Sequence, residues 1–166
     1  FGLKYWAGCK EDHDGTWFGG LEGYPEGGSA RTFTRTGLEK ILKACDVKDY
    51  SFYYPYPDYK FPTVIYSDRR LPGMGELTDN LRNFDRDRML LFNEKYVFDS
   101  ILQDKLFDVF SNSYLVVIGK EPETCYVKYS NDRAPEFSMR TDIVETENGR
   151  VVRKIPCDEA ARGHIR

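Results

Sequence analysis

The stretch from residue 50 to residue 61 constrains the fold more than any other part of the sequence. It holds seven aromatic residues among twelve, and Pro55 and Pro57 interrupt it. Aromatic residues favour β-strands, so residues 50–54 are predicted to form a strand. The prolines are expected to end it, because proline lacks an amide hydrogen and restricts the residue before it. Strand alternation then places Phe52 and Tyr54 on one face and Tyr53 on the other.

Two interpretations of this aromatic run stay open. If the run is packed, its rings alternate into a core and the prolines brace the connection that follows. If it is exposed, the flat rings of Tyr54, Tyr56 and Tyr59 offer platforms on which sugar rings stack. The second interpretation makes the chain a non-enzymatic carbohydrate-binding or interaction module built on residues 50–61.

Hydrophobic periodicity predicts two principal helices and several strands around the aromatic run. Apolar residues three and four apart predict a helix over 38–45, which begins at Thr34 or through a capping box that starts at Thr36. Asn93 is predicted to begin a second helix that continues to about Asp104. The remaining predicted elements are an apolar helical turn at 106–110 and strands at 61–67, 114–119, 125–129, 137–145 and 149–155.

After residue 121 the pattern changes to short alternating strands. The continuous apolar run at 114–119 is typical of a buried strand, whereas Asn148-Gly149 is a strong hairpin signal between two alternating strands. We predict an α+β chain with a mixed or largely antiparallel sheet, divided near residue 121 into regions 1–121 and 122–166. Sheet edges without partners favour self-association, so a homodimer through those edges is expected.

Composition excludes some classes of function. The chain has 24 Lys+Arg against 27 Asp+Glu and a net charge of -3, without the basic stripe of a dedicated nucleic-acid binder. No apolar run approaches the roughly 18 residues of a membrane span. The four scattered cysteines and two histidines lack the spacing of a zinc site. We expect no metal, reduced thiols and a cytoplasmic location.

The densest group of titratable residues lies in the glycine- and aromatic-rich first thirty residues. His13 is flanked by Asp12 and Asp14, and a neighbouring carboxylate can raise a histidine pKa and favour general-base chemistry. A solvated loop whose polar side chains cap turns explains the same residues. No phosphate-binding glycine loop, nucleophile elbow or HExxH motif accompanies them, so the residues alone identify no complete catalytic machinery.

Two groups of basic residues have both a functional and a structural interpretation. Arg69-Arg70 and the arginines within 82–88 could hold a phosphate or carboxylate, but the interleaved aspartates favour local ion pairs. Lys154 lies on a predicted strand ahead of a helix that carries Glu159. A strand lysine paired with a helix glutamate holds nucleotide phosphates in kinase-like small lobes. An ordinary surface lysine is the plainer explanation.

Four short segments together resemble bacterial class I S-adenosylmethionine-dependent methyltransferases, of a type associated with polysaccharide biosynthesis and glycosyl transfer. The helix at 38–45, the strand at 50–58 and the segment at 110–114 match that family in order, so the resemblance covers about residues 1–119. The tail after residue 121 resembles the start of a sugar- or aminoglycoside-kinase-like small lobe. The four segments, which match the stretch after the family's fifth core strand, are Gly2-Leu3-Lys4-Tyr5-Trp6-Ala7-Gly8, Glu11-Asp12-His13, Gly20-Leu21-Glu22-Gly23-Tyr24 and Arg31-Thr32-Phe33-Thr34.

The resemblance implies that the chain is the acceptor-side, C-terminal fragment of such a methyltransferase and is inactive alone. It implies the late part of a Rossmann-like sheet followed by a C-terminal β-hairpin region. The cofactor of the parent enzyme would be S-adenosylmethionine, held mostly by strands that precede Phe1. His13 would act as the base. The residues implied to bind a small-molecule or glycan acceptor are Lys4, Tyr5, Asp12, Trp17 and Tyr24.

Overall fold

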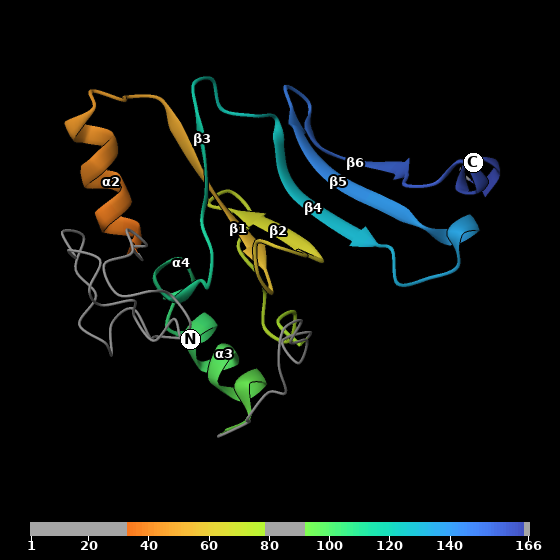
Figure 1. The fold of residues 1–166 in the computed structure, drawn as a ribbon, viewed down its shortest axis with the longest axis horizontal. Coiled ribbons are helices and arrows are strands. Elements are labelled where there is room, and N and C mark those ends of the chain that lie inside the picture. Colours follow the sequence, from red (N-terminus) through yellow and green to blue (C-terminus); the bar gives the residue numbers. More distant parts are fainter. Residues whose placement is uncertain (1–32, 79–91, 165–166) are drawn as a thin grey trace, which may run out of the picture.

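The computed structural model describes residues 33–78 and 92–164, which form one six-stranded sheet with short helices (Figure 1). All neighbouring strands in this part of the chain pair antiparallel, in the order β3-β1-β2-β4-β5-β6. The strands are β1 (Tyr50–Tyr56), β2 (Val64–Ser67), β3 (Leu115–Ile118), β4 (Thr124–Ser130), β5 (Met139–Thr146) and β6 (Gly149–Pro156).

The α+β class and the largely antiparallel sheet are confirmed for the described residues. The Rossmann-like assignment is not supported, because a Rossmann-like sheet is built mainly from parallel strands joined by crossover helices. Here β1 and β2 follow each other as an antiparallel hairpin, and β4, β5 and β6 form an antiparallel meander.

The two principal helices begin at side-chain caps. Thr34 accepts a hydrogen bond from the amide of Gly37 at 3.0 Å and begins α2 (Arg35–Ala44). The Thr34 alternative is therefore right, and the capping box at Thr36 is wrong. Asn93 accepts from the amide of Lys95 at 3.1 Å and begins α3 (Glu94–Gln103), as predicted.

Three shorter helical segments complete the described elements. The apolar turn predicted after α3 is α4 (Phe107–Phe110). The other two are 3-10 helices, η1 (Pro135–Phe137) and η2 (Glu159–His164). Asp158 lies directly before η2, and its carboxylate accepts a hydrogen bond from the amide of Ala160 at 2.9 Å.

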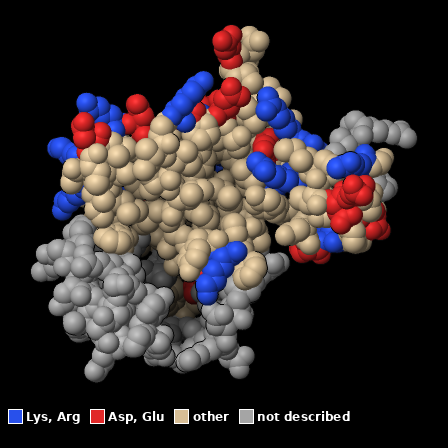
Figure 2. Space-filling model, turned by 45° about the horizontal axis from the view of Figure 1, so that its top comes forward, with Lys and Arg blue, Asp and Glu red and all other residues tan. Residues whose placement is uncertain are grey.

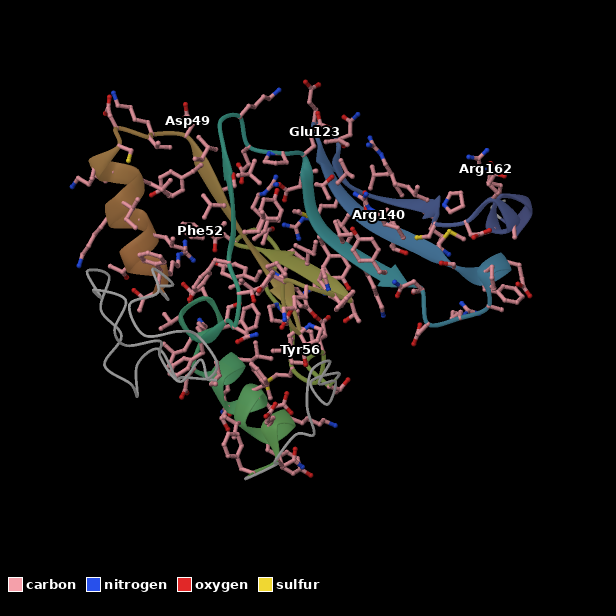
Figure 3. All side chains as sticks on the ribbon, in the orientation of Figure 1. Asp49, Phe52, Tyr56, Glu123, Arg140 and Arg162 are labelled. Carbon is pink, nitrogen blue, oxygen red and sulfur yellow. The ribbon has the colours of Figure 1, made fainter. Side chains whose placement is uncertain are left out.

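One face of β1 and β2 forms an aromatic core against the helices. Tyr54 meets Phe107 of α4 edge-on with ring centroids 5.6 Å apart, and Tyr56 meets Phe98 of α3 in the same way at 6.1 Å. Figure 3 labels Phe52 and Tyr56 on β1. Such edge-to-face pairs stabilise a core beyond the burial of their area. The packed interpretation of the aromatic run is therefore confirmed for β1. The buried cluster consists of Leu42, Phe52, Tyr54, Tyr56, Val64, Tyr66, Leu77, Phe98 and Phe107.

Pro55 lies inside β1 and does not end it, contrary to the prediction. β1 pairs with β3 only at residues 50–53 and with β2 only at residues 53–56. One edge of β1 is therefore unpaired at residue 55, and a proline is tolerated where a strand has a free edge. The strand continues to Tyr56 for this reason.

The apolar run predicted to be a buried strand lies at an edge of the described sheet. β3 pairs with β1 alone, with Tyr50 opposite Ile118 and Tyr53 opposite Leu115. Leu115 and Ile118 are 44% and 63% exposed. The expectation of burial is wrong for these residues, because burial depends on a neighbouring strand that the described residues do not supply.

The hairpin signal at Asn148-Gly149 is confirmed. β5 and β6 pair along their whole lengths, from Met139 opposite Pro156 to Thr146 opposite Gly149. Gly149 has φ of 112°, a conformation that residues with a side chain rarely adopt. The Thr146 hydroxyl donates to the Gly149 carbonyl at 2.8 Å and closes the turn.

The sheet continues across the boundary predicted near residue 121. β2 pairs with β4 at Val64 opposite Lys128 and at Ile65 opposite Val127. The amide of Tyr129 extends this join by donating to the carbonyl of Thr63 at 2.8 Å. The division into regions 1–121 and 122–166 stays a prediction, and it separates two halves of one hydrogen-bonded sheet.

Candidate functional site

Most residues implied by the methyltransferase resemblance lie outside the described part of the chain. These are His13, Lys4, Tyr5, Asp12, Trp17 and Tyr24. Their roles stay predictions.

Two of the three tyrosines proposed for sugar stacking are buried. Tyr54 and Tyr56 lie in the aromatic core and present no ring face to solvent, so this structure corrects their assignment as ligand platforms. Tyr59 behaves differently. It follows β1 and is 67% exposed, and Phe61, two residues later, is 60% exposed. The first half of the aromatic run is buried on both faces of β1 from Phe52 to Tyr56, whereas its second half reaches the surface.

A pocket lies beside this exposed end of the run. Its volume is about 440 Å³, and it lies between the β1–β2 connection and the end of β4. The connection is held in place because the amide of Thr63 donates to the carbonyl of Tyr56 at 2.8 Å, and the amide of Lys60 donates to the Asp58 carboxylate at 2.5 Å. The lining residues are Lys60, Phe61, Pro62, Thr63, Tyr129, Asn131 and Asp132.

The chemistry of the pocket suits a small polar ligand with an apolar face. Phe61 and Tyr129 supply aromatic surface, and Asn131 supplies an amide that can both donate and accept hydrogen bonds. Lys60 and Asp132 add one charge of each sign. Binding sites combine apolar walls with a small number of polar groups, and the lining of this pocket has both. The sequence analysis included Phe61 in the aromatic run but named only tyrosines for stacking, and it missed Tyr129 of β4 and Asn131, which follows that strand.

Arg35 joins four elements beside the aromatic core. Its guanidinium donates to both carboxylate oxygens of Asp68, after β2, at 2.8 and 2.9 Å, and to Asp108 of α4 at 3.0 Å. It also lies 4.8 Å from the ring centroid of Phe52. The hydroxyl of Tyr54 donates to Asp68 as well, and burial, followed by that carboxylate, raises the pKa of Tyr54. These contacts make Arg35 a structural bridge from α2 to the sheet.

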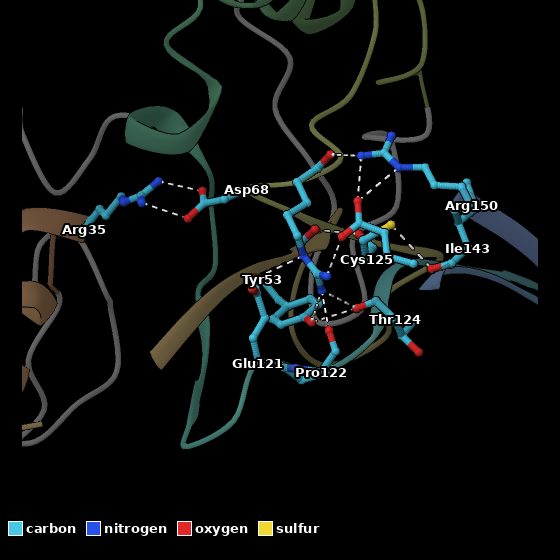
Figure 4. Close-up of polar contacts among 12 residues, drawn as sticks. Arg35, Tyr53, Asp68, Glu121, Pro122, Thr124, Cys125, Ile143 and Arg150 are labelled. Atoms are coloured by element: carbon cyan, nitrogen blue, oxygen red, sulfur yellow. Dashed lines mark hydrogen bonds and ion pairs between the residues drawn. The ribbon is translucent and has the colours of Figure 1, made fainter. Parts of the chain in front are cut away.

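Arg69 forms a second bridge, between the end of β2 and the start of the C-terminal meander. Figure 4 labels its partners Glu121, Pro122 and Thr124. Arg69 donates to Glu145 of β5 at 2.6 Å and to the carbonyl oxygens of Pro122 and Thr124. Its Nε lies 3.0 Å from a carboxylate oxygen of Glu121. Arg150 of β6 also donates to Glu145, and the two arginines hold the pKa of that carboxyl below its usual value.

Arg70 makes a bidentate ion pair with Glu76, at 2.7 and 3.1 Å. Its guanidinium also lies 5.1 Å from the ring centroid of Tyr126. The hydrogen bond from Arg70 is the main cause of a lowered Glu76 pKa. Both arginines of the Arg69-Arg70 pair are thus engaged by carboxylates of this chain, which favours the ion-pair interpretation over an anion site. The arginines within 82–88 lie outside the described residues.

Lys154 and Glu159 are not brought together as a kinase-like lobe would require. Lys154 is exposed on β6, and Glu159 is exposed at the start of η2. Glu159 instead lies 4.0 Å from Arg162. No ion pair joins Lys154 to Glu159 in this structure. Their assignment to phosphate binding has no support from this geometry.

Comparisons of this chain with protein-family models, with curated proteins and with solved structures found no match. Among the described residues, no three His, Cys, Asp or Glu side chains gather into a group that could hold a metal ion. None of the described helices has the length and apolar character to cross a membrane. The candidate site of the described region is therefore the pocket beside Phe61.

Proposed function

We propose that this chain is the acceptor-side part of an S-adenosylmethionine-dependent methyltransferase and that its sheet is completed at β3 by strands that precede residue 1 in a longer protein. The observation that carries the proposal is the uncovered apolar edge of β3. The four residues of this strand are Leu115, Val116, Val117 and Ile118, and its outer edge has no partner among the described residues.

An edge of this kind is unusual for a strand that faces water. Natural edge strands are protected by charged side chains, proline or bulges, because an apolar edge pairs with any available strand. β3 is short, with four residues, but it has no charge, proline or bulge, and a continuous apolar strand is typical of a sheet interior. Its composition therefore suits a strand with a neighbour on both sides.

The order of elements supports the methyltransferase class as the source of that neighbour. In the resemblance, a helix, a strand and a final strand follow the acceptor loop, and here α2, β1 and β3 come in that order with β1 beside β3. The antiparallel pairing of β1 with β3 suits the terminal strands that the resemblance assigns to this region. The loop with His13 would then lie directly before α2 in the sequence.

The described residues do not fit a binding site for the cofactor itself. Such sites lie at the carboxyl ends of parallel strands, beside a glycine-rich turn that leads into a helix. Every strand pair described here is antiparallel. None of the strands β1, β2, β4 and β5 leads directly into an α-helix: a further strand, an irregular segment or a 3-10 helix follows each of them. The proposal therefore assigns cofactor binding to the completing strands.

The test extends the chain at its N-terminus with the residues encoded directly upstream in its gene, and measures S-adenosylmethionine binding by calorimetry. The extended protein is expected to bind one equivalent, and the 166-residue chain none. His13→Ala in the extended protein should keep cofactor binding and abolish methyl transfer to the surface glycans of the host cell. His164→Ala, which alters the other histidine of the chain, is the matched control and should retain transfer. An extended protein that binds no cofactor would overturn the proposal.

A glycan-binding module is the second candidate, because Tyr59 and Phe61 are exposed next to the pocket. Carbohydrate rings stack on such aromatic faces while their hydroxyls bond to amides and carboxylates. Saturation-transfer NMR with neutral and acidic oligosaccharides tests it on the chain as it stands. Phe61→Ala should abolish the transfer signal, whereas Tyr96→Ala, which removes an equally exposed ring from α3, should leave it unchanged. Absence of signal from every oligosaccharide would reject this candidate.

A further inference from the structure

The opposite edge of the sheet, β6, has a different character from β3. All its residues from Gly149 to Ile155 are exposed, and β5 is its only partner in the described region. Alternate residues of an edge strand direct their amide and carbonyl groups away from the sheet. β6 thus presents the outward amide and carbonyl groups of alternate residues along its eight-residue length.

The side chains of β6 are basic and apolar. Arg150, Arg153 and Lys154 are the charged residues of this strand, and it contains no carboxylate. The exposed apolar residues are Val151, Val152 and Ile155. Because side chains alternate in a strand, each face of β6 carries both cationic and apolar groups. In Figure 2 the right-hand projection, where β5, β6 and η2 lie, carries basic and acidic groups close together.

Two of the three cations of β6 are not neutralised within the described chain. Arg150 is held by Glu145 at 2.9 Å. Arg153 lies opposite Asp142 in the ladder, but Asp142 is buried and already accepts two hydrogen bonds of 2.7 Å from Arg140. Neither Arg153 nor Lys154 makes an ion pair with any residue that the structure describes. They are therefore available to an anionic partner.

We propose that β6 is a docking site for an extended acidic polypeptide segment, which adds as a seventh strand to the sheet. Main-chain hydrogen bonds supply affinity in this mode of recognition, and the alternate side chains supply specificity. Carboxylates of the segment pair with Arg153 and Lys154, and its apolar residues lie beside Val151 and Val152. This site is separate from the β3 edge and from the pocket, and it does not depend on the methyltransferase proposal.

Charge decides between an acidic segment and a second copy of this chain. Pairing two β6 strands would bring three cations from each copy to one narrow ladder, with no carboxylate on either strand. Like charges across a ladder are destabilising, whereas opposite charges stabilise it. The whole chain has a net charge of only -3, so the excess positive charge is specific to this strand.

The experiment measures fluorescence anisotropy of a fluorescein-labelled peptide of two Glu-Glu-Val-Val repeats with the full chain, because Arg153 and Lys154 lie on opposite faces of β6 and need carboxylates on both faces of the added strand. Saturable binding that weakens with added salt is expected. A second peptide has the same sequence but carries an N-methyl group on every residue, which keeps its charge and removes the backbone donors of both strand edges. It should bind more than about tenfold more weakly, because strand addition requires the backbone bonds.

Protein variants test the role of the charges. The double variant Arg153→Glu/Lys154→Glu should weaken peptide binding by more than about tenfold, since like charges across an interface are costly. Lys48→Glu/Lys120→Glu makes the same change in net charge at exposed positions outside β6, and should stay within about twofold of the unchanged chain. Circular dichroism checks that each variant is folded.

Three outcomes would overturn the proposal. If the N-methylated peptide binds as tightly as the unmodified one, the peptide adheres by charge alone and adds no strand. This comparison uses the unsubstituted protein, so it does not depend on the folding of a variant. Equal loss in the Lys48/Lys120 control would mean that net charge alone governs binding. Sedimentation that shows a dimer abolished by Arg153→Glu/Lys154→Glu would mean that a second copy occupies β6.

Discussion

The hydroxyl of Ser67, at the end of β2, donates a 2.6 Å hydrogen bond to the carbonyl oxygen of Cys125 in β4, and both residues are buried. The ladder between β2 and β4 is short, with register pairs only at Val64 and Ile65. The side-chain bond therefore extends the join between the two halves of the sheet by two further residues. Cys125 lies where the pairing of β4 with β5 is irregular, between Thr124 and Tyr126.

Replacing Ser67 with alanine should lower the free energy of unfolding by about 1–2 kcal/mol, because the buried carbonyl of Cys125 loses its donor. Urea denaturation followed by circular dichroism measures the change. Thr146→Ala removes an exposed hydroxyl bond in the β5–β6 turn and should cost less than about 1 kcal/mol. If both variants lose the same free energy of unfolding, burial does not strengthen the contribution of the Ser67 hydrogen bond.

Replacing Arg35 with leucine should destabilise the chain by about 1–3 kcal/mol. The arginine is largely buried and pairs with carboxylates of Glu39, Asp68 and Asp108, which would be left facing one another. The partners are partly exposed, so the loss should fall below that of a fully buried pair. Lys48→Leu removes an exposed cation 3.7 Å from Asp46 and serves as the control, with little expected change in urea midpoint.

The buried tyrosines should make the fold sensitive to alkaline pH. Burial, with the Glu76 carboxylate second, raises the pKa of Tyr66 above the usual tyrosine value of 10.0, and burial also raises the pKa of Tyr126. A pKa that is higher in the folded than in the unfolded state gives stability that is complete below pH 10. That stability is lost as the pH rises toward the folded value. Circular dichroism across an alkaline titration should show unfolding that begins near pH 10.

Tyr66→Phe separates this titration from packing. The variant keeps the ring contacts with Phe107 and Tyr126, so stability at neutral pH should change by less than about 1 kcal/mol. The midpoint of alkaline unfolding should move to higher pH, because phenylalanine has no hydroxyl whose ionisation favours the unfolded state. An unchanged alkaline midpoint would show that Tyr66 does not contribute to this dependence.

The outer edge of β3, which has no partner strand among the described residues, should make the isolated chain self-associate at micromolar concentration. Ile118→Lys places a charge on this edge, and sedimentation velocity should then show a monomer. Val152→Lys makes the same kind of change on β6, at a residue that is 60% exposed, and should not alter association. If the unsubstituted chain sediments as a monomer, the β3 edge does not require a partner strand.

The sequence predicted the elements whose signals are local. Thr34 and Asn93 accept hydrogen bonds from amides in the first turns of α2 and α3, so residue type and spacing located the start of α3 and limited that of α2 to Thr34 or Thr36. Alternation along residues 50–54 predicted which side of β1 Phe52 and Tyr54 would share, since the period of a strand is two residues. Asn148-Gly149 marked its hairpin because Gly149 adopts a positive φ that few residues tolerate.

Tertiary structure alone decided which strands are neighbours, and burial follows from neighbours. Pro55 is tolerated within β1 because β3 stops pairing at Tyr53, and the apolar run of β3 is exposed because nothing described lies beyond it. Arg35 meets Asp68 and Asp108, 33 and 73 residues away along the chain, and no local spacing encodes those contacts. The pocket likewise joins Phe61 to Tyr129 only after β2 pairs with β4. The sequence determined the local geometry of this protein, whereas its bridges, edges and pocket arose from long-range pairing.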